Sequence, residues 1–212
     1  MSGTTAPGRN TRERILEAAW ALVAEQGPET VRIADIAAAA LVTRQLVYAH
    51  FENRAGLLTA MARHRDRTSK FAERSAAVDA LPPTEALEAL LRAWCDYIPE
   101  ILPVARALEA AATAGAEGAA AWRDRMHALY ETFRKTINRV HRAGMLIRPW
   151  TVRTATDFAW AQCHISCYQH LVVERRWRPA RYTDHTVGLV IGNLLGTFPD
   201  REAPDRHVAL PG

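Results

Sequence analysis

Residues 32–51, RIADIAAAALVTRQLVYAHF, constrain the fold of this chain more than any other segment. Ile33 and Ile36 lie at helical spacing in the first half and predict a short helix. Thr43 is a suitable N-cap for a second helix, because its hydroxyl can accept hydrogen bonds from the free N–H groups of the first turn. The apolar anchors of that second helix are Leu46, Val47 and Phe51. Two short helices that meet at a sharp turn are typical of a helix-turn-helix.

A helix-turn-helix places its second helix in the major groove of DNA, with its first residues at the base edges. Arg44 and Gln45 occupy this first turn. Arginine reads guanine and glutamine reads adenine, while Leu46 can contact a thymine methyl group. The alternative for Arg44 and Gln45 is a solvated helix face.

Residues 11–26 predict a preceding helix, which ends at a Gly-Pro pair and braces the two short helices. Arg9, which precedes this helix, and Arg12, in its first turn, either reach a minor groove or a phosphate or stay in solvent. The apolar stripe of the predicted helix consists of Ile15, Ala18, Ala19, Leu22 and Val23.

Several short motifs follow one another in order between residues 14 and 61. They are Arg14-Ile15-Leu16-Glu17-Ala18-Ala19, Glu25, Gly27, Asp35-Ile36-Ala37, Val42-Thr43, Tyr48-Ala49-His50-Phe51, Arg54 and Leu57-Leu58. In this combination the segment resembles the DNA-binding domain of the TetR family of transcriptional regulators. The resemblance covers about a quarter of the 212 residues.

The resemblance implies that the start of the second short helix reads bases and that Tyr48, His50 and Arg54 hold phosphates. The chemistry agrees, because a phenol, an imidazole and a guanidinium all donate hydrogen bonds to phosphate oxygens. A half-buried structural role is the alternative for Tyr48 and His50. The expected DNA-binding residues are Arg32, Thr43, Arg44, Gln45, Leu46, Tyr48, His50 and Arg54.

Two positions depart from the family pattern. Leu41 stands where the family usually has glycine in the turn, and a left-handed backbone there costs leucine about 1–2 kcal/mol relative to glycine. Arg32 replaces the serine or threonine that usually caps the first of the two short helices. A side-chain cap is therefore lost, although an arginine at this position can meet a phosphate.

The composition sets broad limits. The net charge of +4 is compatible with a polyanionic partner without demanding one. The N-terminus has no apolar signal-peptide region, no apolar run is long enough to span a membrane, and three cysteines indicate a reducing compartment. We therefore expect a cytoplasmic protein without a membrane partner. GxGxxG, P-loop, GxSxG and HExxH motifs are absent, so neither an enzyme nor a cofactor is predicted.

The remaining sequence is helical in pattern throughout. We expect helices at residues 54–78, 84–98, 105–112, 122–144, 151–175 and 183–197, with an irregular or helical piece between Pro99 and Pro103. The predicted fold class is all-α, with about nine helices. It comprises a three-helix helix-turn-helix DNA-binding domain (11–58), a helical ligand-binding and dimerisation domain (59–198) and flexible tails (1–10 and 199–212).

The second domain is rich in aromatic residues, which at helical spacing are usually core. In the resembling family this domain is a ligand pocket, and aromatic side chains near polar groups favour a mostly apolar cavity for a small-molecule effector. The candidate lining residues are Trp94, Tyr97, Trp122, Met126, Tyr130, Phe133, Phe158, Gln162 and Tyr168.

Cys163, Cys167 and His170 have the i, i+4, i+7 spacing of one helical face. Thiolates and an imidazole suit zinc or copper, but three ligands on one helix need a fourth from elsewhere to surround a tetrahedral ion. A buried cysteine usually packs as a small apolar residue. We therefore predict no metal site and keep a metal-responsive or redox-responsive regulator as an alternative.

Gly188, Gly192 and Gly196 are spaced four apart in the last predicted helix. Glycine weakens a helix, so this spacing suggests close approach by another helix. The resembling family dimerises through its last two helices, and these glycines suit that interface. Packing within one subunit is the alternative.

Together these patterns predict a homodimeric, ligand-responsive transcriptional regulator. By family resemblance it is a repressor of pseudo-palindromic double-stranded operator DNA that a small molecule releases. The alternatives are a helical small-molecule-binding protein that has lost DNA binding, and the regulator that responds through Cys163, Cys167 and His170.

Overall fold

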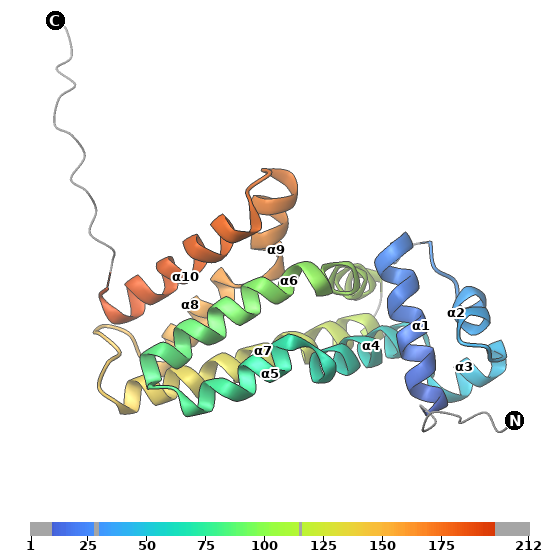
Figure 1. Ribbon diagram of the computed structural model, residues 1–212, viewed down its shortest axis with the longest axis horizontal. Coiled ribbons are helices and arrows are strands. Elements are labelled where there is room, and N and C mark those ends of the chain that lie inside the picture. The colour runs from blue at the N-terminus through green and yellow to red at the C-terminus, as the bar shows by residue number, and fades with distance from the viewer. Residues whose placement is uncertain (1–9, 28–29, 115, 198–212) are drawn as a thin grey trace, which may run out of the picture. The chain divides into compact units, whose positions relative to one another are not determined.

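The computed structural model describes residues 10–27, 30–114 and 116–197 (Figure 1). These residues form ten α-helices and contain no strand, which confirms the predicted all-α class. None of the helices in this part of the chain has the length and apolar character needed to cross a membrane. The predicted tails lie outside the described residues, except for Asn10, whose side chain accepts a hydrogen bond from the backbone N–H of Arg12. Arg9 also lies outside them.

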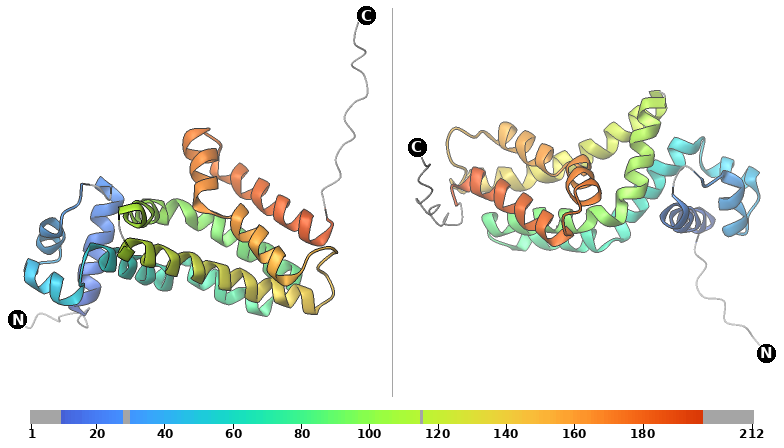
Figure 2. Two further views of the ribbon diagram at one scale, coloured as in Figure 1. Left: turned by 180° about the vertical axis from the view of Figure 1, so that it is seen from behind. Right: turned by 90° about the horizontal axis from the view of Figure 1, so that it is seen from above.

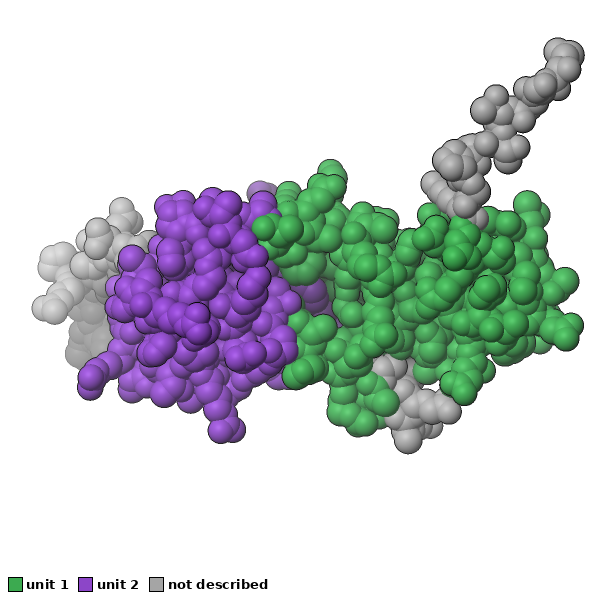
Figure 3. Space-filling view, turned by 90° about the horizontal axis from the view of Figure 1, so that it is seen from below, with its two compact units in different colours: residues 1–76, 97–129 green, residues 77–96, 130–212 purple. Residues whose placement is uncertain are grey.

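The chain divides into two compact units (Figure 3). Unit 1 comprises residues 1–76 and 97–129, and unit 2 comprises residues 77–96 and 130–212. Two long helices, α6 (Pro83–Ala114) and α7 (Ala116–Arg142), contribute residues to both units. The predicted DNA-binding domain, 11–58, falls entirely within unit 1, and its functional boundary at residue 58 stays a prediction.

Unit 1 begins with α1 (Thr11–Gln26), α2 (Ile33–Ala39), α3 (Arg44–His50) and α4 (Arg54–Thr68). Helix α1 packs against both α2 and α4, and α2 packs against α3 (Figure 1). Ile15, Ala19 and Val23 of the predicted apolar stripe are buried. They share one core with residues of the next three helices, including Ile36, Val47, Leu57, Leu58 and Met61. The bundle therefore holds α3 by its apolar side only.

The predicted single helix from residue 54 to 78 is wrong in one respect, because it breaks at Ser69. The backbone of Ser69 is extended (φ −84°, ψ 160°), and a separate helix α5 (Lys70–Ala77) follows, then a 3₁₀ turn η1 (Val78–Ala80). The buried Ser69 hydroxyl accepts a hydrogen bond from the backbone N–H of Ala72 at 3.3 Å. Serine is a good N-cap, so this side chain starts a new helix where periodicity alone continues the old one.

Helix α6 runs unbroken through Pro99 and Pro103, so the piece between them, expected to be irregular or helical, is helical and joins the two predicted helices. These prolines lie four residues apart, so both missing N–H donors fall on one face of the helix. Helix α7 ends as predicted near Gly144, whose φ is +71°. Hydrogen bonds from the N–H groups of Gly144 to His141 and of Met145 to Val140 form a Schellman motif.

In unit 2, the predicted long helix at 151–175 is three pieces. Helix α8 (Val152–Gln162) ends at Cys163, α9 (Ile165–Tyr168) follows, and residues Gln169–Glu174 form a π-helical segment, η2. The His164 side chain caps α9, because its Nδ1 accepts a hydrogen bond from the N–H of Ser166. The last helix, α10 (Pro179–Leu195), starts earlier than predicted, with Pro179 at the first helical position. Helices α8 and α10 lie side by side (Figure 2).

Candidate nucleic-acid interface

Helix α3 presents a polar face to solvent on one side of unit 1. Its N-cap is Thr43, whose hydroxyl accepts a hydrogen bond from the N–H of Leu46 at 3.2 Å. Val47 is buried and anchors the helix in the core. Exposed side chains on α3 are Arg44, Gln45, Leu46, Tyr48 (49% exposed) and His50. Tyr48 and His50 are therefore not the half-buried structural residues of the alternative interpretation.

The turn between α2 and α3 is left-handed at Leu41, which has φ +55° and an 86% exposed side chain. Two hydrogen bonds, from Leu41 N–H to Ala38 and from Val42 N–H to Ala37, close a Schellman motif around it. The turn therefore keeps the geometry for which the family uses glycine, and leucine bears the strain.

Arg14 of α1 holds this turn through hydrogen bonds to its backbone, a role that the sequence did not predict. Its guanidinium donates hydrogen bonds to the carbonyl oxygens of Ala40 at 2.7 Å and Leu41 at 3.5 Å. These carbonyls lie at the C-terminal end of α2, where oxygens lack helical partners. A positive group there satisfies them and also complements the helix dipole.

Arg32 and Asp35 define the start of α2. The Arg32 side chain is exposed and makes no capping hydrogen bond, as its identity predicted. Its backbone N–H, however, donates to the Asp35 carboxylate at 2.9 Å, which is half of a capping box. Asp35 thus supplies one of the two hydrogen bonds of a capping box, the bond to a residue 32 side chain is missing, and the Arg32 guanidinium remains in solvent.

Arg54, the first residue of α4, was expected to hold a phosphate. In the structure its Nη1 donates to the carbonyl oxygen of Val31 at 2.7 Å, which ties α4 to the segment before α2. The adjacent Asn53 caps α4 by accepting from the N–H of Gly56 at 2.8 Å. A phosphate contact by Arg54 stays a prediction that now competes with this internal bond. Arg12 lies over the ring of Phe51, 5.1 Å from its centroid, at the end of α3.

The predicted ligand-lining residues are divided between the units. Tyr97, Trp122 and Met126 belong to unit 1, and the other six belong to unit 2. Several of their polar atoms already have partners, since Trp94 Nε1 donates to the Cys163 carbonyl and the Tyr130 hydroxyl bonds Asp157. Two surface hollows of about 510 and 520 Å³ lie in unit 1, beside α4, and neither is lined by these nine residues. Their ligand role stays a prediction.

The premise of the metal alternative is wrong, because Cys163, Cys167 and His170 do not share one continuous helix. Cys163 is buried at the end of α8, while His170 is exposed and pairs with Glu174. No cluster of ligating residues in the described ranges could hold a metal. The Cys163 pKa is raised well above its ordinary value by a hydrogen bond with Cys95 and by burial, so its thiol stays protonated and weakly reactive.

The three glycines of the last helix occupy different environments. Gly188 has open space around the position of a Cβ atom, whereas Gly192 is buried within the subunit. Gly196 ends α10 in a left-handed conformation (φ +73°). Gly188 is half-buried and Gly196 is exposed, so both reach the surface, and a dimer contact through them stays a prediction.

An exposed polar helix held on a three-helix core defines a helix-turn-helix DNA-binding protein. Residues 15–61 match the family model of bacterial regulatory proteins of the tetR family. The sequence matches none of the curated proteins with which it was compared.

Three solved structures share the fold over almost their whole length. One is described as a TetR-family transcriptional regulator from Rhodococcus sp., with TM-score 0.72 and 20% identity over 87% of this chain and 98% of that one. A transcriptional regulator from Saccharomonospora viridis in complex with choline has TM-score 0.71 and 21% identity, over 87% and 97%. The regulator FadR from Bacillus subtilis in complex with stearoyl-CoA has TM-score 0.69 and 12% identity, over 86% and 98%.

These comparisons confirm the resemblance drawn from the sequence. Residues 15–61 are a TetR-family DNA-binding domain, and the described chain has the fold of TetR-family transcriptional regulators.

Proposed function

We propose that this protein is a cytoplasmic homodimer that represses transcription from a pseudo-palindromic operator and is released by a largely apolar small molecule. The observation that carries the proposal is helix α3. Its first turn places Arg44, Gln45 and Leu46 in solvent on a buried anchor, Val47. Base-reading side chains on a rigid helix are what direct readout in a major groove requires.

The DNA contacts divide into two kinds. Arg44 and Gln45 would read base edges, and Tyr48 and His50 would bond phosphates and fix the position of the helix on the duplex. Arg32 is exposed at the start of α2 and can add a phosphate contact. The strained Leu41 turn preserves the geometry between α2 and α3, which argues against loss of DNA binding.

Effector binding by this chain rests on likeness to its structural neighbours. The Saccharomonospora viridis regulator was solved with choline and the Bacillus subtilis regulator with stearoyl-CoA, so this fold accommodates ligands of very different size. The buried aromatic residues of unit 2 favour an apolar ligand. Binding that differs between the DNA-competent and DNA-incompetent states would shift the population between them.

Selection from a random pool of duplex DNA tests this proposal. Purified protein should enrich a motif with two inverted half-sites centred about 34–36 Å apart, or a multiple of that spacing, because a two-fold dimer reads two successive major grooves. Gln45→Ala should enrich a motif that is degenerate at one position of each half-site. A pool that shows no enriched motif, or a single asymmetric one, would refute the homodimeric repressor. Release of the selected duplex then provides the screen for effectors.

A further inference from the structure

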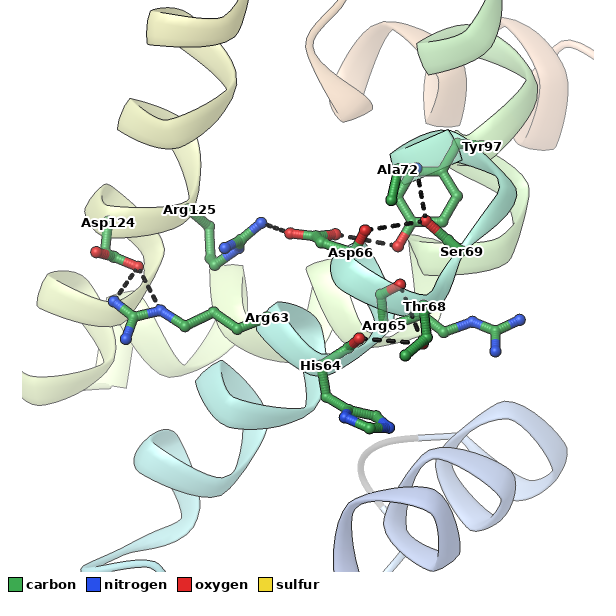
Figure 4. Close-up of polar contacts among 10 residues, drawn as sticks. All are labelled: Arg63, His64, Arg65, Asp66, Thr68, Ser69, Ala72, Tyr97, Asp124 and Arg125. Carbon is green, nitrogen blue, oxygen red and sulfur yellow. Dashed lines mark hydrogen bonds and ion pairs between the residues drawn. The ribbon is translucent and has the colours of Figure 1, made fainter. Parts of the chain in front are cut away.

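A polar cluster joins the last turn of α4 to α6 and α7 within unit 1 (Figure 4). Its centre is the Asp66 carboxylate. One oxygen forms an ion pair with Arg125 of α7, and the other accepts a hydrogen bond from the Tyr97 hydroxyl of α6 at 3.0 Å. Asp66 therefore connects three helices through a single side chain. We call Asp66, Arg125 and Tyr97 the α4 clasp.

The clasp is sheltered from water. The Arg125 and Asp66 side chains are 18% and 24% exposed, and Tyr97 is buried. Tyr97 also stacks on Phe71 of α5, with ring centroids 5.2 Å apart. An ion pair in such surroundings is screened little by salt, and removal of one partner leaves the other charge without compensation.

A second ion pair between the same two helices provides a natural comparison. Nη2 of Arg63 in α4 lies 2.7 Å from a carboxylate oxygen of Asp124 in α7. Arg63 is on the same helix as Asp66, and Asp124 directly precedes Arg125 in the sequence. The Arg63 and Asp124 side chains are 51% and 43% exposed, so water and salt weaken this pair. The two pairs share helices and charges but differ in burial.

The clasp lies at the point where α4 stops. Ser69 follows one residue after α4 and breaks the helix, and its hydroxyl donates to the Asp66 carbonyl at 3.3 Å. Because backbone hydrogen bonds do not continue through this break, the end of α4 depends on side chains for its position. The other end of α4 joins the core that carries α3.

Chain connectivity gives the clasp a route to unit 2. Tyr97 and Arg125 each lie in the unit 1 portion of a long helix, α6 or α7, whose remaining residues belong to unit 2. A shift of either helix along its axis moves the side chain, Tyr97 or Arg125, that contacts Asp66. A packed polar junction of this kind can exist in discrete formed and broken arrangements.

On the basis of the proposed function, we propose that Asp66 is a positioning residue for DNA binding: the formed clasp fixes the end of α4 and so orients the recognition helix. Both contacts of Asp66 are formed in the structure. Breaking them should therefore weaken operator binding.

Two parallel double-mutant cycles test this role with the full-length protein and the selected operator duplex. The first cycle uses Asp66→Asn, Arg125→Gln and their combination, and the second uses Asp124→Asn, Arg63→Gln and theirs. Each variant is measured for operator affinity and for thermal unfolding. A cycle isolates the energy of the pair from the effects of each substitution. Tyr97→Phe removes one hydroxyl without a cavity and serves if a charge variant unfolds.

The clasp predicts that Asp66→Asn and Arg125→Gln each weaken operator binding about tenfold, which is about 1.4 kcal/mol. The double variant should be no weaker than either single variant, and Tyr97→Phe should lose two- to threefold. The exposed pair should change binding by less than twofold.

Coupling that appears only in thermal unfolding, with operator affinity unchanged in folded Asp66→Asn or Tyr97→Phe, would reduce the clasp to a structural contact. Equal effects of the two cycles on binding would likewise refute a specific role. Wild-type protein that binds no operator would instead refute the proposed function, so the two failures are distinguishable.

Discussion

Replacement of Leu41 by glycine should stabilise the protein, which is the reverse of what loss of a large apolar residue usually does. Leu41 has φ +55°, and this left-handed conformation costs a non-glycine residue about 1–2 kcal/mol. Its side chain is 86% exposed, so truncation gives up little buried surface. Glycine increases the entropy of the unfolded chain by an amount that offsets about 0.4–1 kcal/mol. The net gain should be about 0.5–1 kcal/mol.

The assay is urea unfolding of full-length protein at matched concentration, followed by circular dichroism. Two comparison variants bracket the result. Arg176→Gly replaces the other described non-glycine residue with positive φ (+59°) and should also stabilise. Ala38→Gly places glycine inside α2 and should destabilise by about 1 kcal/mol. If Leu41→Gly lowers stability as Ala38→Gly does, the strain assigned to the turn is refuted.

Three further predictions concern stability. Arg14→Ala removes the donor to the Ala40 carbonyl and should destabilise the protein by about 1.5–3 kcal/mol in urea unfolding. An unchanged unfolding midpoint would mean that water replaces the guanidinium. Arg139→Ala should also destabilise by about 1.5–3 kcal/mol, because the guanidinium donates hydrogen bonds to the carbonyls of Val78, Asp79 and Leu81 between α5 and α6. Arg142→Ala is the matched control, and an equal loss of stability in both variants would contradict a specific role for these three hydrogen bonds. Burial raises the pKa of Tyr97 and Tyr182 above the ordinary 10.0, so the folded state keeps protons that the unfolded chain releases. The stability contributed by these two groups should be fully present below about pH 10 and fall as the pH rises above it. Phenolate absorbance from both residues should rise only when the protein unfolds.

The helix-turn-helix was predictable because its signals are local. Thr43 caps α3 and Val47 anchors it, as the pattern indicates, and α1 spans the predicted residues. The conditional prediction about Leu41 also held, since the turn is left-handed. Each feature depends on residues within one or two helical turns, so no knowledge of tertiary contacts was needed.

Helix boundaries in the rest of the chain were less predictable because capping competes with periodicity. Ser69 and His164 each start a new helix through a side-chain hydrogen bond, although the apolar spacing on both sides suggests continuity. Pro99 and Pro103 left the piece between them open between irregular and helical, and the buried residues around them keep α6 whole. At Ser69 and His164 a local side-chain cap decided between two plausible structures, whereas at the two prolines tertiary packing did.

The supporting contacts of the interface were not predictable from sequence. Arg14 meets Ala40 across 26 positions and Arg54 meets Val31 across 23. Both arginines belong to the motifs on which the family resemblance is based, but nothing in the sequence indicates which backbone carbonyls they bind. The same holds for Asp66 and Arg125, which only the fold brings together.

The most direct test of DNA recognition by α3 is binding of the purified protein to duplex DNA from around its own gene, at two salt concentrations. Arg44→Ala should relax sequence preference, with a loss of about 1–3 kcal/mol on the preferred site. Tyr48→Phe should weaken binding to all sequences equally, because it removes a phosphate donor. Binding that is weak, indifferent to sequence and unchanged by both substitutions, here and in competition with random genomic fragments, would contradict the account.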